Sequence, residues 1–239
     1  CRIYTAIHRQ LSVYHQGFIA NRSTITNLFV LTQYISEAID NNEQVDVIYT
    51  DFSKAFDKIN IDTLLNKLID FGFSDDAREL LSSYLSNRKQ FVTYNGYQSK
   101  RYITPSGVPQ GSNLGPLLFL LFINDLCNSL ICNRLCFADD MKIYTVINSV
   151  NDCVLLQSQL NLLHSWCISN NLQLNISKCK IVSYTRKKLV CEYNYCIEVS
   201  AIERCSNVCD LGVIFDQKLT FSNHILKKTS DALKACGFI

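Results

Sequence analysis

The sequence has 239 residues, of which 48% are hydrophobic and 18% are charged. A chain of this length can bury a substantial core as one or two domains, and its 3 prolines and 8 glycines exclude long disordered linkers. The net charge of +2 is small for a nucleic-acid-binding protein, which usually presents a strongly basic face, although local basic clusters such as Arg186-Lys187-Lys188 soften that objection.

Twelve cysteines are scattered along the chain without two Cys-x-x-Cys pairs or a Cys/His pattern of the kind that binds zinc. We expect no signal peptide ahead of them, and therefore reduced thiols, mostly buried as small apolar groups, in place of disulfides. They are Cys1, Cys127, Cys132, Cys136, Cys153, Cys167, Cys179, Cys191, Cys196, Cys205, Cys209 and Cys236.

The first part of the chain predicts a helix over Thr24–Asp40 and a strand over Val45–Asp51. The strand is rich in β-branched and aromatic residues, and it ends in the acid Asp51. Two further helices are expected over Ile61–Phe71 and Asp75–Ser86.

Short strands are expected next, over Gln90–Tyr94 and Tyr102–Thr104, with a hairpin turn at Asn95-Gly96. A loop then runs from Pro105 to Pro116 and leads into a helix over Leu114–Leu130. The apolar run in this helix is shorter than the roughly 20 residues that cross a bilayer, so we expect a buried helix and no membrane partner.

The loop before this helix has the composition of a ligand-binding segment, since Pro, Gly, Gln and Ser dominate it. Gly107 and Gly111 let the backbone approach a ligand closely, and Gln110 offers an amide that both donates and accepts hydrogen bonds. Ser112 or Asn113 can cap the helix that follows.

The most informative segment is Phe137-Ala138-Asp139-Asp140, which lies between predicted strands over Arg134–Phe137 and Lys142–Ile147. Adjacent carboxylates repel each other and a bound divalent cation offsets that repulsion, so the pair is a candidate metal site, with an ordinary Asp-Asp turn as the alternative. If the strand that ends in Asp51 lies beside this hairpin, three carboxylates suit six-coordinate Mg²⁺. Two such ions about 3.5–4 Å apart promote in-line phosphoryl displacement, so the pattern favours polymerase chemistry.

The last part of the chain predicts a helix over Asn151–Asn170 and strands over Lys180–Tyr184 and Val208–Phe215. We expect the apolar stripe of the helix to comprise Val154, Leu155, Leu162, Leu163 and Trp166.

Six groups of residues stand in an order that matches a known family. They are His15-Gln16-Gly17-Phe18 with Asn21-Arg22-Ser23-Thr24, Asp51 to Asp57, Ser106-Gly107-Val108-Pro109-Gln110-Gly111-Ser112 with Leu114-Gly115-Pro116, Phe137 to Asp140, Leu174-Asn175 with Lys178-Cys179, and Asp210-Leu211-Gly212-Val213 with Asp216. In this order and spacing, the chain resembles a reverse transcriptase, specifically the polymerase region of a jockey-like non-LTR retrotransposon. The resemblance covers nearly the whole chain.

The resemblance implies a catalytic centre built on three acids. Asp51, Asp139 and Asp140 would bind two Mg²⁺ ions, helped by the backbone carbonyl of Phe52. A lysine would donate a proton to the departing pyrophosphate. We assign that role to Lys178, although Lys180 also qualifies by position. The alternative for each of them is a solvated surface lysine without a catalytic role.

The resemblance also assigns the nucleotide pocket. Phe56, close to Phe52, would lie under the incoming sugar and collide with a ribose 2′-hydroxyl, so deoxynucleotides are the implied substrate; anchoring of the loop in the core is the alternative. Gln110 and Gly111 would shape the pocket, unless Gln110 points to water.

Other residues receive smaller roles. Leu211 and Gly212 would support the primer terminus, by resemblance to the primer-grip region. We expect Asp57 to cap or brace its loop. Arg22 either contacts template phosphate or caps and salt-bridges near the start of the first long helix.

The implied fold is α/β (α+β), namely a right-hand polymerase palm with an antiparallel sheet backed by helices, partial fingers and a truncated thumb. Residues 1–44 would be partial fingers, 45–205 the palm with inserted fingers elements, and 206–239 the primer-grip region and the start of the thumb. We expect a piece of a larger element protein, with an endonuclease on the full-length chain, or a degenerate genomic copy.

The implied activity is RNA-directed DNA polymerisation with an RNA template, a DNA primer and dNTPs as partners. We expect an intracellular location in nucleus and cytoplasm, because target-primed insertion requires access to chromatin. One alternative is a catalytically inactive remnant that binds RNA or another protein. The other is an RNA-dependent RNA polymerase, which Phe56 and the Ala-led acid pair disfavour.

Overall fold

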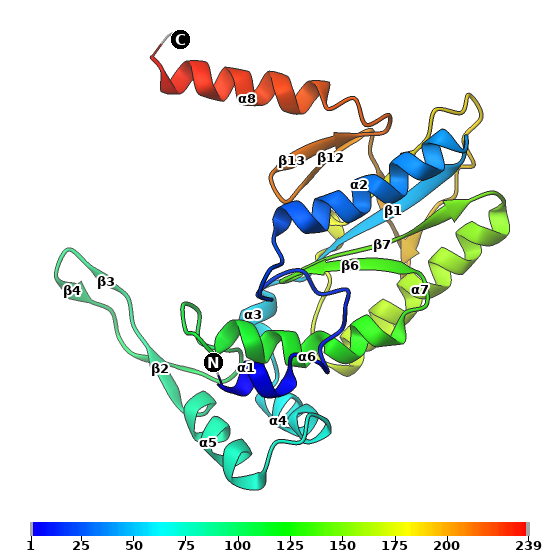
Figure 1. Cartoon of the computed structure of the whole chain (residues 1–239). Helices are drawn as coiled ribbons and strands as arrows, with labels where there is room; N and C mark the ends of the chain where they lie inside the picture. Colours follow the sequence, from blue (N-terminus) through cyan, green and yellow to red (C-terminus); the bar gives the residue numbers. More distant parts are fainter. Residues whose placement is uncertain (1, 238–239) are drawn as a thin grey trace.

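The computed structural model describes residues 2–237, and a five-stranded sheet lies at its centre (Figure 1). Strand β1 pairs antiparallel with β7 on one side and with β8 on the other, and β6 extends the sheet antiparallel to β7. The short strand β11 adds to β8 in parallel at the opposite edge. The strand bounds, in sheet order, are β11 (Glu203–Arg204), β8 (Lys180–Tyr184), β1 (Gln44–Asp51), β7 (Asp140–Ile147) and β6 (Asn133–Phe137).

Helices cover both faces of this sheet, and β1 is buried on both of its sides. Val45 and Val47 belong to the apolar cluster formed with α2 (Thr24–Asp40). Ile48 belongs to the larger cluster that contains the buried residues of α6 (Gly115–Ser129) and α7 (Val150–Ser169). The expectation of a mainly antiparallel sheet backed by helices is therefore confirmed.

Side-chain caps fix the helix ends that the sequence predicted best. Ser23 forms a capping box with Thr26, so α2 begins at Thr24 as expected. Asn60 caps α4 (Ile61–Asp70), and Ser74 caps α5 (Asp75–Leu85). Short helices that the sequence did not predict are α1 (Arg2–Ile7), α3 (Ala55–Lys58) and the 3-10 turn η1 (Ile176–Lys178).

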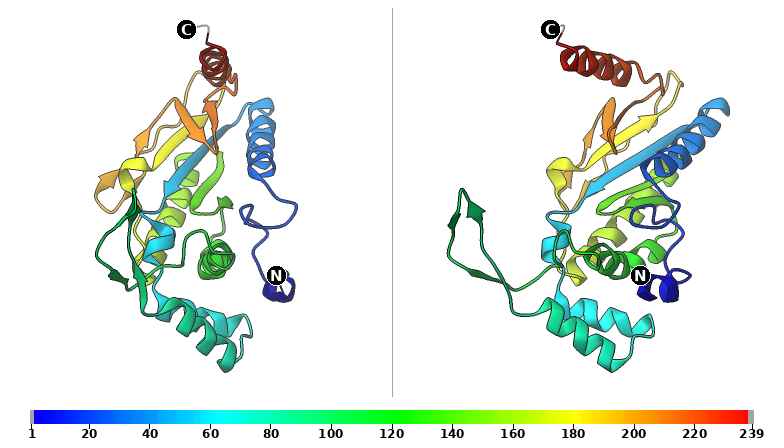
Figure 2. Two further views of the ribbon diagram at one scale, coloured as in Figure 1. Left: turned by 90° about the vertical axis from the view of Figure 1, so that its left-hand side faces the viewer. Right: turned by 60° about the vertical axis from the view of Figure 1, so that its left-hand side comes forward.

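A two-stranded arm extends from the end of α5, and the right-hand view of Figure 2 shows it reaching away from the central sheet. Its base is β2 (Arg88–Gln90) paired with β5 (Tyr102–Thr104), and its tip is β3 (Thr93–Tyr94) paired with β4 (Tyr97–Gln98). Asn95 and Gly96 have φ angles of 46° and 81°, which confirms the predicted hairpin turn. The prediction of a single strand over Gln90–Tyr94 is wrong, because β2 ends at Gln90 and β3 begins only at Thr93.

The predicted strand over Val208–Phe215 is also wrong, since this segment folds as a hairpin. Strands β12 (Asn207–Asp210) and β13 (Val213–Asp216) pair antiparallel. Leu211 and Gly212, with φ angles of 45° and 87°, form the two-residue turn between them. The small hairpin of β9 (Cys196–Ile197) and β10 (Ser200–Ala201) precedes it, and α8 (Ser222–Ala235), which has no buried residue, follows it.

The buried face of α7 differs from the predicted stripe. Its buried apolar positions are Cys153, Leu156, Leu160, Leu163 and Cys167, which recur every three or four residues. Of the predicted stripe, Leu163 is buried and Trp166 is partly buried against the core, whereas Val154, Leu155 and Leu162 are exposed. The prediction failed because it left the cysteines out of the periodicity, although cysteine packs as a small apolar residue.

The eleven described cysteines are all free thiols, five of them buried and two exposed. Cys1 lies outside the described residues. Within residues 2–237 no helix is both long enough and apolar enough to span a membrane.

Candidate active site

Asp51 and Asp140 lie directly opposite each other on neighbouring strands. The register of β1 and β7 pairs Asp51 with Asp140, and cross-strand partners project from the same face of a sheet. Both residues line a cleft of about 420 Å³ together with Lys178, Lys180 and Leu211. Strand pairing therefore unites two predicted catalytic acids that are 89 positions apart in the sequence.

Asp139 lies next to this pair, in the turn between β6 and β7. Desolvation, followed by the negative charges of Asp139, Asp210 and Asp51, raises the pKa of the Asp140 carboxyl to about 6, whereas the charge of Lys142 opposes the shift. Like charges placed directly opposite each other in a sheet are destabilising. The acids thus form one electrostatically coupled group that favours a compensating positive charge.

The donor set fits a hard divalent cation, because carboxylate oxygens are the ligands that Mg²⁺ and similar ions prefer. Asp140 lies close to the negative charges of Asp139, Asp210 and Asp51, and a divalent cation bound among them would offset their mutual repulsion. Among the described residues, the carboxylate oxygens of Asp51, Asp139 and Asp140 do not all lie within 4.8 Å of one another. The ligand atoms that do so belong to His15, Cys127 and Cys136, at a different place in the structure.

The two candidate lysines differ in their partners. The Nζ atom of Lys178 is 3.4 Å from Oδ2 of Asp51. Lys180 forms an ion pair with Glu203, and the hydrogen bond that the lysine donates to this carboxylate raises the pKa of the lysine. Both lysines line the cleft, but Lys178 is the one that contacts a predicted catalytic acid.

Backbone contacts hold the end of β1 against the segment before η1. Phe52 forms a bridge with Leu174, flanked by hydrogen bonds from Asn175 N to Asp51 O (2.8 Å) and from Ser53 N to the carbonyl of the facing segment (2.7 Å). Neither hydrogen bond uses the carbonyl of Phe52, whose side chain is buried. This carbonyl therefore remains available for the predicted role of metal ligand.

Phe56 packs between aromatic rings just beyond Asp51. It stacks on Phe119 of α6 with ring centroids 4.4 Å apart and an interplanar angle of 18°, and it meets the edge of Phe18 at 6.2 Å. The ring is partly buried, so it is anchored in the core while part of its surface stays exposed. The two roles weighed for Phe56, anchor and sugar contact, are thus compatible.

The loop before α6 packs on the turn after β1. A Cβ atom on Gly107 would lie 2.6 Å from the backbone of Phe56 and Asp57, so glycine is required for this approach. Gln110 donates a hydrogen bond of 3.0 Å to the Asp57 carboxylate, which gives Asp57 the expected loop-bracing role. Gln110 lines a second cleft of about 540 Å³, separate from that of the acids.

Neighbouring side chains support this loop. Ser112 accepts a hydrogen bond from the N–H of Gly115, but the N-cap position of α6 is Leu114, so the prediction that Ser112 or Asn113 caps this helix is wrong. Arg88 donates to the carbonyls of Ser106 and Gly107, a bracing role that the sequence did not indicate. Gly111 has a φ of 76° and open space on its Cβ side.

Arg22 has a different role from those expected. Its guanidinium donates to the carbonyls of Val13 and His15 and so folds the N-terminal segment, whereas Ser23 caps α2.

A buried ion pair that the sequence did not reveal lines the same cleft as the acids. Lys142 of β7 and Asp210 of β12 pair with side chains 1% and 4% exposed, and Lys142 also donates to Oδ1 of Asn27 on α2 (2.8 Å). These contacts fix the β12–β13 hairpin, whose turn carries Leu211 and Gly212, beside the sheet. The one available signal was a lysine inside an otherwise apolar strand.

Comparison with known proteins identifies the family. The family model described as reverse transcriptase (RNA-dependent DNA polymerase) matches residues 1–221. The chain is 29% identical over 235 residues to the RNA-directed DNA polymerase from mobile element jockey of Drosophila funebris, covering 94% of this chain and 25% of that protein. It is 31% identical over 230 residues to the probable RNA-directed DNA polymerase from transposon BS of Drosophila melanogaster, covering 90% and 25%. The chain thus spans about a quarter of the length of these relatives.

Among solved structures, apo telomerase from Candida tropicalis, truncated from its C-terminal domain, matches 92% of this chain and 43% of its own chain. The TM-score is 0.62 at 11% sequence identity, so the likeness shows the fold alone and agrees with the expected right-hand polymerase architecture. The family model shows that the chain belongs to the reverse transcriptase family, and its sequence is similar to the polymerases of jockey-like mobile elements.

Proposed function

We propose that this chain is the polymerase region of an RNA-directed DNA polymerase from a non-LTR retrotransposon, and that it adds deoxynucleotides to a primer 3′-hydroxyl. The observation that carries the proposal is the cross-strand pair of Asp51 and Asp140 in one cleft with Lys178. Asp139 adjoins the pair and raises the pKa of Asp140 through its charge.

In this proposal Asp51, Asp139, Asp140 and the carbonyl of Phe52 hold two Mg²⁺ ions. Bound there, the ions would polarise the nucleotide phosphates and offset the charge of the carboxylates. Asp51 and Asp140 keep the cleft anionic and orient the bound groups by their positions on two paired strands, and Asp139 adds its charge from the adjoining turn. Rigid strands hold such a site more precisely than loops do.

Lys178 is the proton donor in this scheme. Its ammonium group lies beside Asp51, at the edge of the cleft where pyrophosphate would leave. Lys180 is held by Glu203 instead, and a lysine whose pKa is raised by a carboxylate gives up its proton less readily.

The remaining contacts select the nucleotide and the primer. The exposed part of the Phe56 ring would collide with a ribose 2′-hydroxyl, and stacking on Phe119 keeps it from moving aside. Gln110 and Gly111 form the wall of the nucleotide pocket, and Leu211 and Gly212 support the primer terminus from the hairpin turn. The RNA template is held through backbone and 2′-hydroxyl contacts.

A longer protein would complete the assembly, with an endonuclease upstream, a DNA primer and an RNA template as partners, and a location in nucleus and cytoplasm. We assign residues 1–44 to partial fingers, 45–205 to the palm and 206–239 to the primer-grip region and the start of the thumb.

Primer extension on poly(rA)/oligo(dT) with Mg²⁺ tests the proposal, with the 239-residue chain measured beside a chain extended at both ends. Asp51→Asn, Asp139→Asn and Asp140→Asn should each lower extension by roughly 10³-fold or more, since each removes charge that the transition state requires. Asp231→Asn, which changes an exposed acid on α8, is the matched control. Extension that survives Asp139→Asn would refute the assignment.

Two further measurements separate the alternatives. Phe56→Ala should increase the use of ribonucleotides, and a wild-type chain that already prefers ribonucleotides would indicate an RNA-dependent RNA polymerase instead. An inactive remnant would bind RNA without extension even after both ends are restored.

A further inference from the structure

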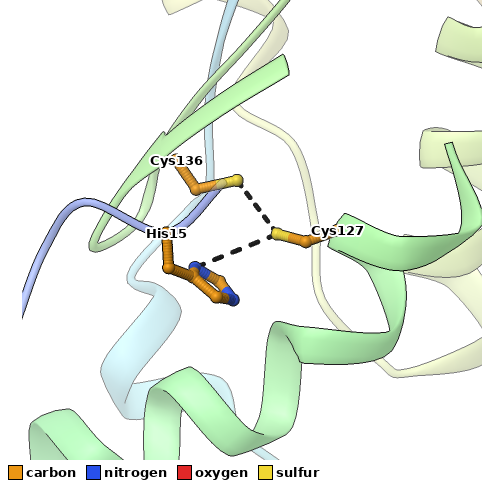
Figure 3. A group of neighbouring side chains, drawn as sticks. All are labelled: His15, Cys127 and Cys136. Atoms are coloured by element: carbon orange, nitrogen blue, oxygen red, sulfur yellow. Dashed lines mark hydrogen bonds between the residues drawn. The ribbon is translucent and has the colours of Figure 1, made fainter. Parts of the chain in front are cut away.

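Three side chains that bind soft metals meet in the core, at a place that the polymerase proposal does not use. They are His15 of the N-terminal segment, Cys127 of α6 and Cys136 of β6 (Figure 3). The sulfur of Cys127 is 2.9 Å from the sulfur of Cys136 and 3.9 Å from Nδ1 of His15. All three residues have no exposed surface.

The backbone fixes two of these residues side by side. His15 and Cys136 are bridge partners, with hydrogen bonds from Gln16 N to Cys136 O (2.8 Å) and from Cys136 N to Tyr14 O (3.0 Å). Cys127 approaches from the buried face of α6. The ligand atoms therefore converge from three segments before any ion binds, which lowers the entropic cost of binding one.

The imidazole of His15 offers one nitrogen to the cluster. Its Nδ1 atom faces the sulfur of Cys127 at 3.9 Å, a distance too long for a strong hydrogen bond, so this nitrogen is the one available as a metal ligand. The buried Nε2 atom also has no hydrogen-bond partner, but an ion bound to Nδ1 would not provide one. Desolvation, followed by the charge of Arg22, lowers the pKa of His15 to about 4, so the ring is neutral and has a lone pair to offer a metal.

We propose that His15, Cys127 and Cys136 bind one thiophilic metal ion, with Zn²⁺ as the expected occupant, and that this ion links the N-terminal segment to α6 and β6. Two thiols lose their protons to solvent as the ion binds, so the charge of Zn²⁺ is balanced by two thiolates. Thiolate and imidazole ligands select such an ion over Mg²⁺, which keeps this site distinct from the acids.

The geometry requires only small side-chain movements. Tetrahedral zinc with Zn–S bonds of about 2.3 Å and Zn–N bonds of about 2.0–2.1 Å separates two sulfurs by about 3.8 Å and a sulfur from a nitrogen by about 3.6 Å. The Cys127 to His15 distance of 3.9 Å is already close to this value. The two sulfurs, now 2.9 Å apart, must separate by roughly 0.9 Å, which rotation of either cysteine side chain provides.

The position of the site gives it a structural purpose. Cys136 is followed directly by the turn that carries Asp139. A Cβ atom on Gly17 would lie 2.6 Å from the backbone nitrogen of Ala138, so the segment that contains His15 packs against this turn. An ion at the site would hold the N-terminal segment against the acid-bearing hairpin.

Metal analysis of the 239-residue chain tests the proposal. The chain is purified with a reductant, equilibrated with Zn²⁺, freed of unbound metal and analysed by mass spectrometry for zinc. We expect about one ion per chain, retained in Cys167→Ser, which changes a buried cysteine of α7 outside the cluster. Cys127→Ser and Cys136→Ser should weaken zinc affinity by roughly 100-fold or more, since even outer partners of metal ligands are worth 10–100-fold.

A measurement on the unchanged chain keeps the test decisive if a variant fails to fold. X-ray absorption of the zinc-loaded chain should show two sulfur ligands and at least one nitrogen ligand. A shell of oxygen and nitrogen alone, equal zinc content in Cys127→Ser and Cys167→Ser, or a Cys127–Cys136 disulfide that persists in the reduced chain would each overturn the proposal.

Discussion

The buried ion pair between Lys142 and Asp210 allows a quantitative test of how the β12–β13 hairpin is held. Desolvation lowers the pKa of Lys142 and raises the pKa of Asp210, while the attraction between the two charges acts in the opposite direction on both groups. Removal of one partner leaves the other charge buried and unpaired. We therefore predict that Lys142→Met and Asp210→Leu each lower the free energy of unfolding by about 3–5 kcal/mol.

Replacement of both partners should cost much less than the two single changes together. An apolar pair removes both desolvation penalties, so Lys142→Met/Asp210→Leu should lose only about 1–3 kcal/mol, mainly because Oδ1 of Asn27 loses the hydrogen bond from Lys142. The double-mutant cycle should then give a coupling energy of about 3 kcal/mol or more.

Urea unfolding followed by the fluorescence of Trp166, the one tryptophan of the sequence, measures these free energies. Trp166 contacts Phe122 in the core, so its emission reports on packing there, away from the substituted pair. Single changes that each cost less than about 1 kcal/mol, or that add without coupling, would show that the pair is hydrated and does not hold the hairpin.

Three further changes test the loop before α6 and the face of α7. Gly107→Ala should lower the free energy of unfolding by about 1–3 kcal/mol more than Gly96→Ala, because both glycines have positive φ but only the first meets backbone at 2.6 Å; equal urea midpoints would contradict this. Leu156→Ala should cost about 2–5 kcal/mol and Leu155→Ala about 0.5 kcal/mol or less, since their exposures are 1% and 60%; thermal unfolding would show the reverse order if the predicted stripe were correct. Arg88→Lys should raise the KM for dNTPs with little change in stability, because one ammonium cannot replace a forked donor to two loop carbonyls.

The sequence predicted best the elements that carry their own local signals. Ser23 and Thr26 cap α2, so the helix begins where the pattern placed it. The β-branched run of β1 ends at Asp51, and the hairpin of β6 and β7 contains Asp139 and Asp140. Strands β1 and β7 pair antiparallel, and this pairing brings Asp51 opposite Asp140, as expected.

Features that depend on contacts between distant segments were not predictable in the same way. The ion pair of Lys142 with Asp210 forms only in the folded chain, so the sequence alone did not explain a lysine within this strand. His15 and Cys127 are 112 positions apart, whereas zinc patterns are recognised from ligands a few residues apart, so no local pattern indicated the cluster. The turn at Leu211 was missed because a non-glycine residue with a positive φ does not read as a turn.

The turn between β6 and β7 shows why distant contacts matter at this site. Phe137 pairs with Asp140, so Ala138 and Asp139 are the two turn residues, and Ala138 has a φ of 53°. A positive φ costs a non-glycine residue about 1–2 kcal/mol of conformational free energy, so Ala138 keeps this conformation only because the surrounding structure imposes it. Pairing with β1 fixes one side of the turn and the backbone around Gly17 presses on the other. The position of Asp139 in this turn therefore depends on residues far from it in sequence, and the N-terminal segment forms part of the structure around the candidate active site.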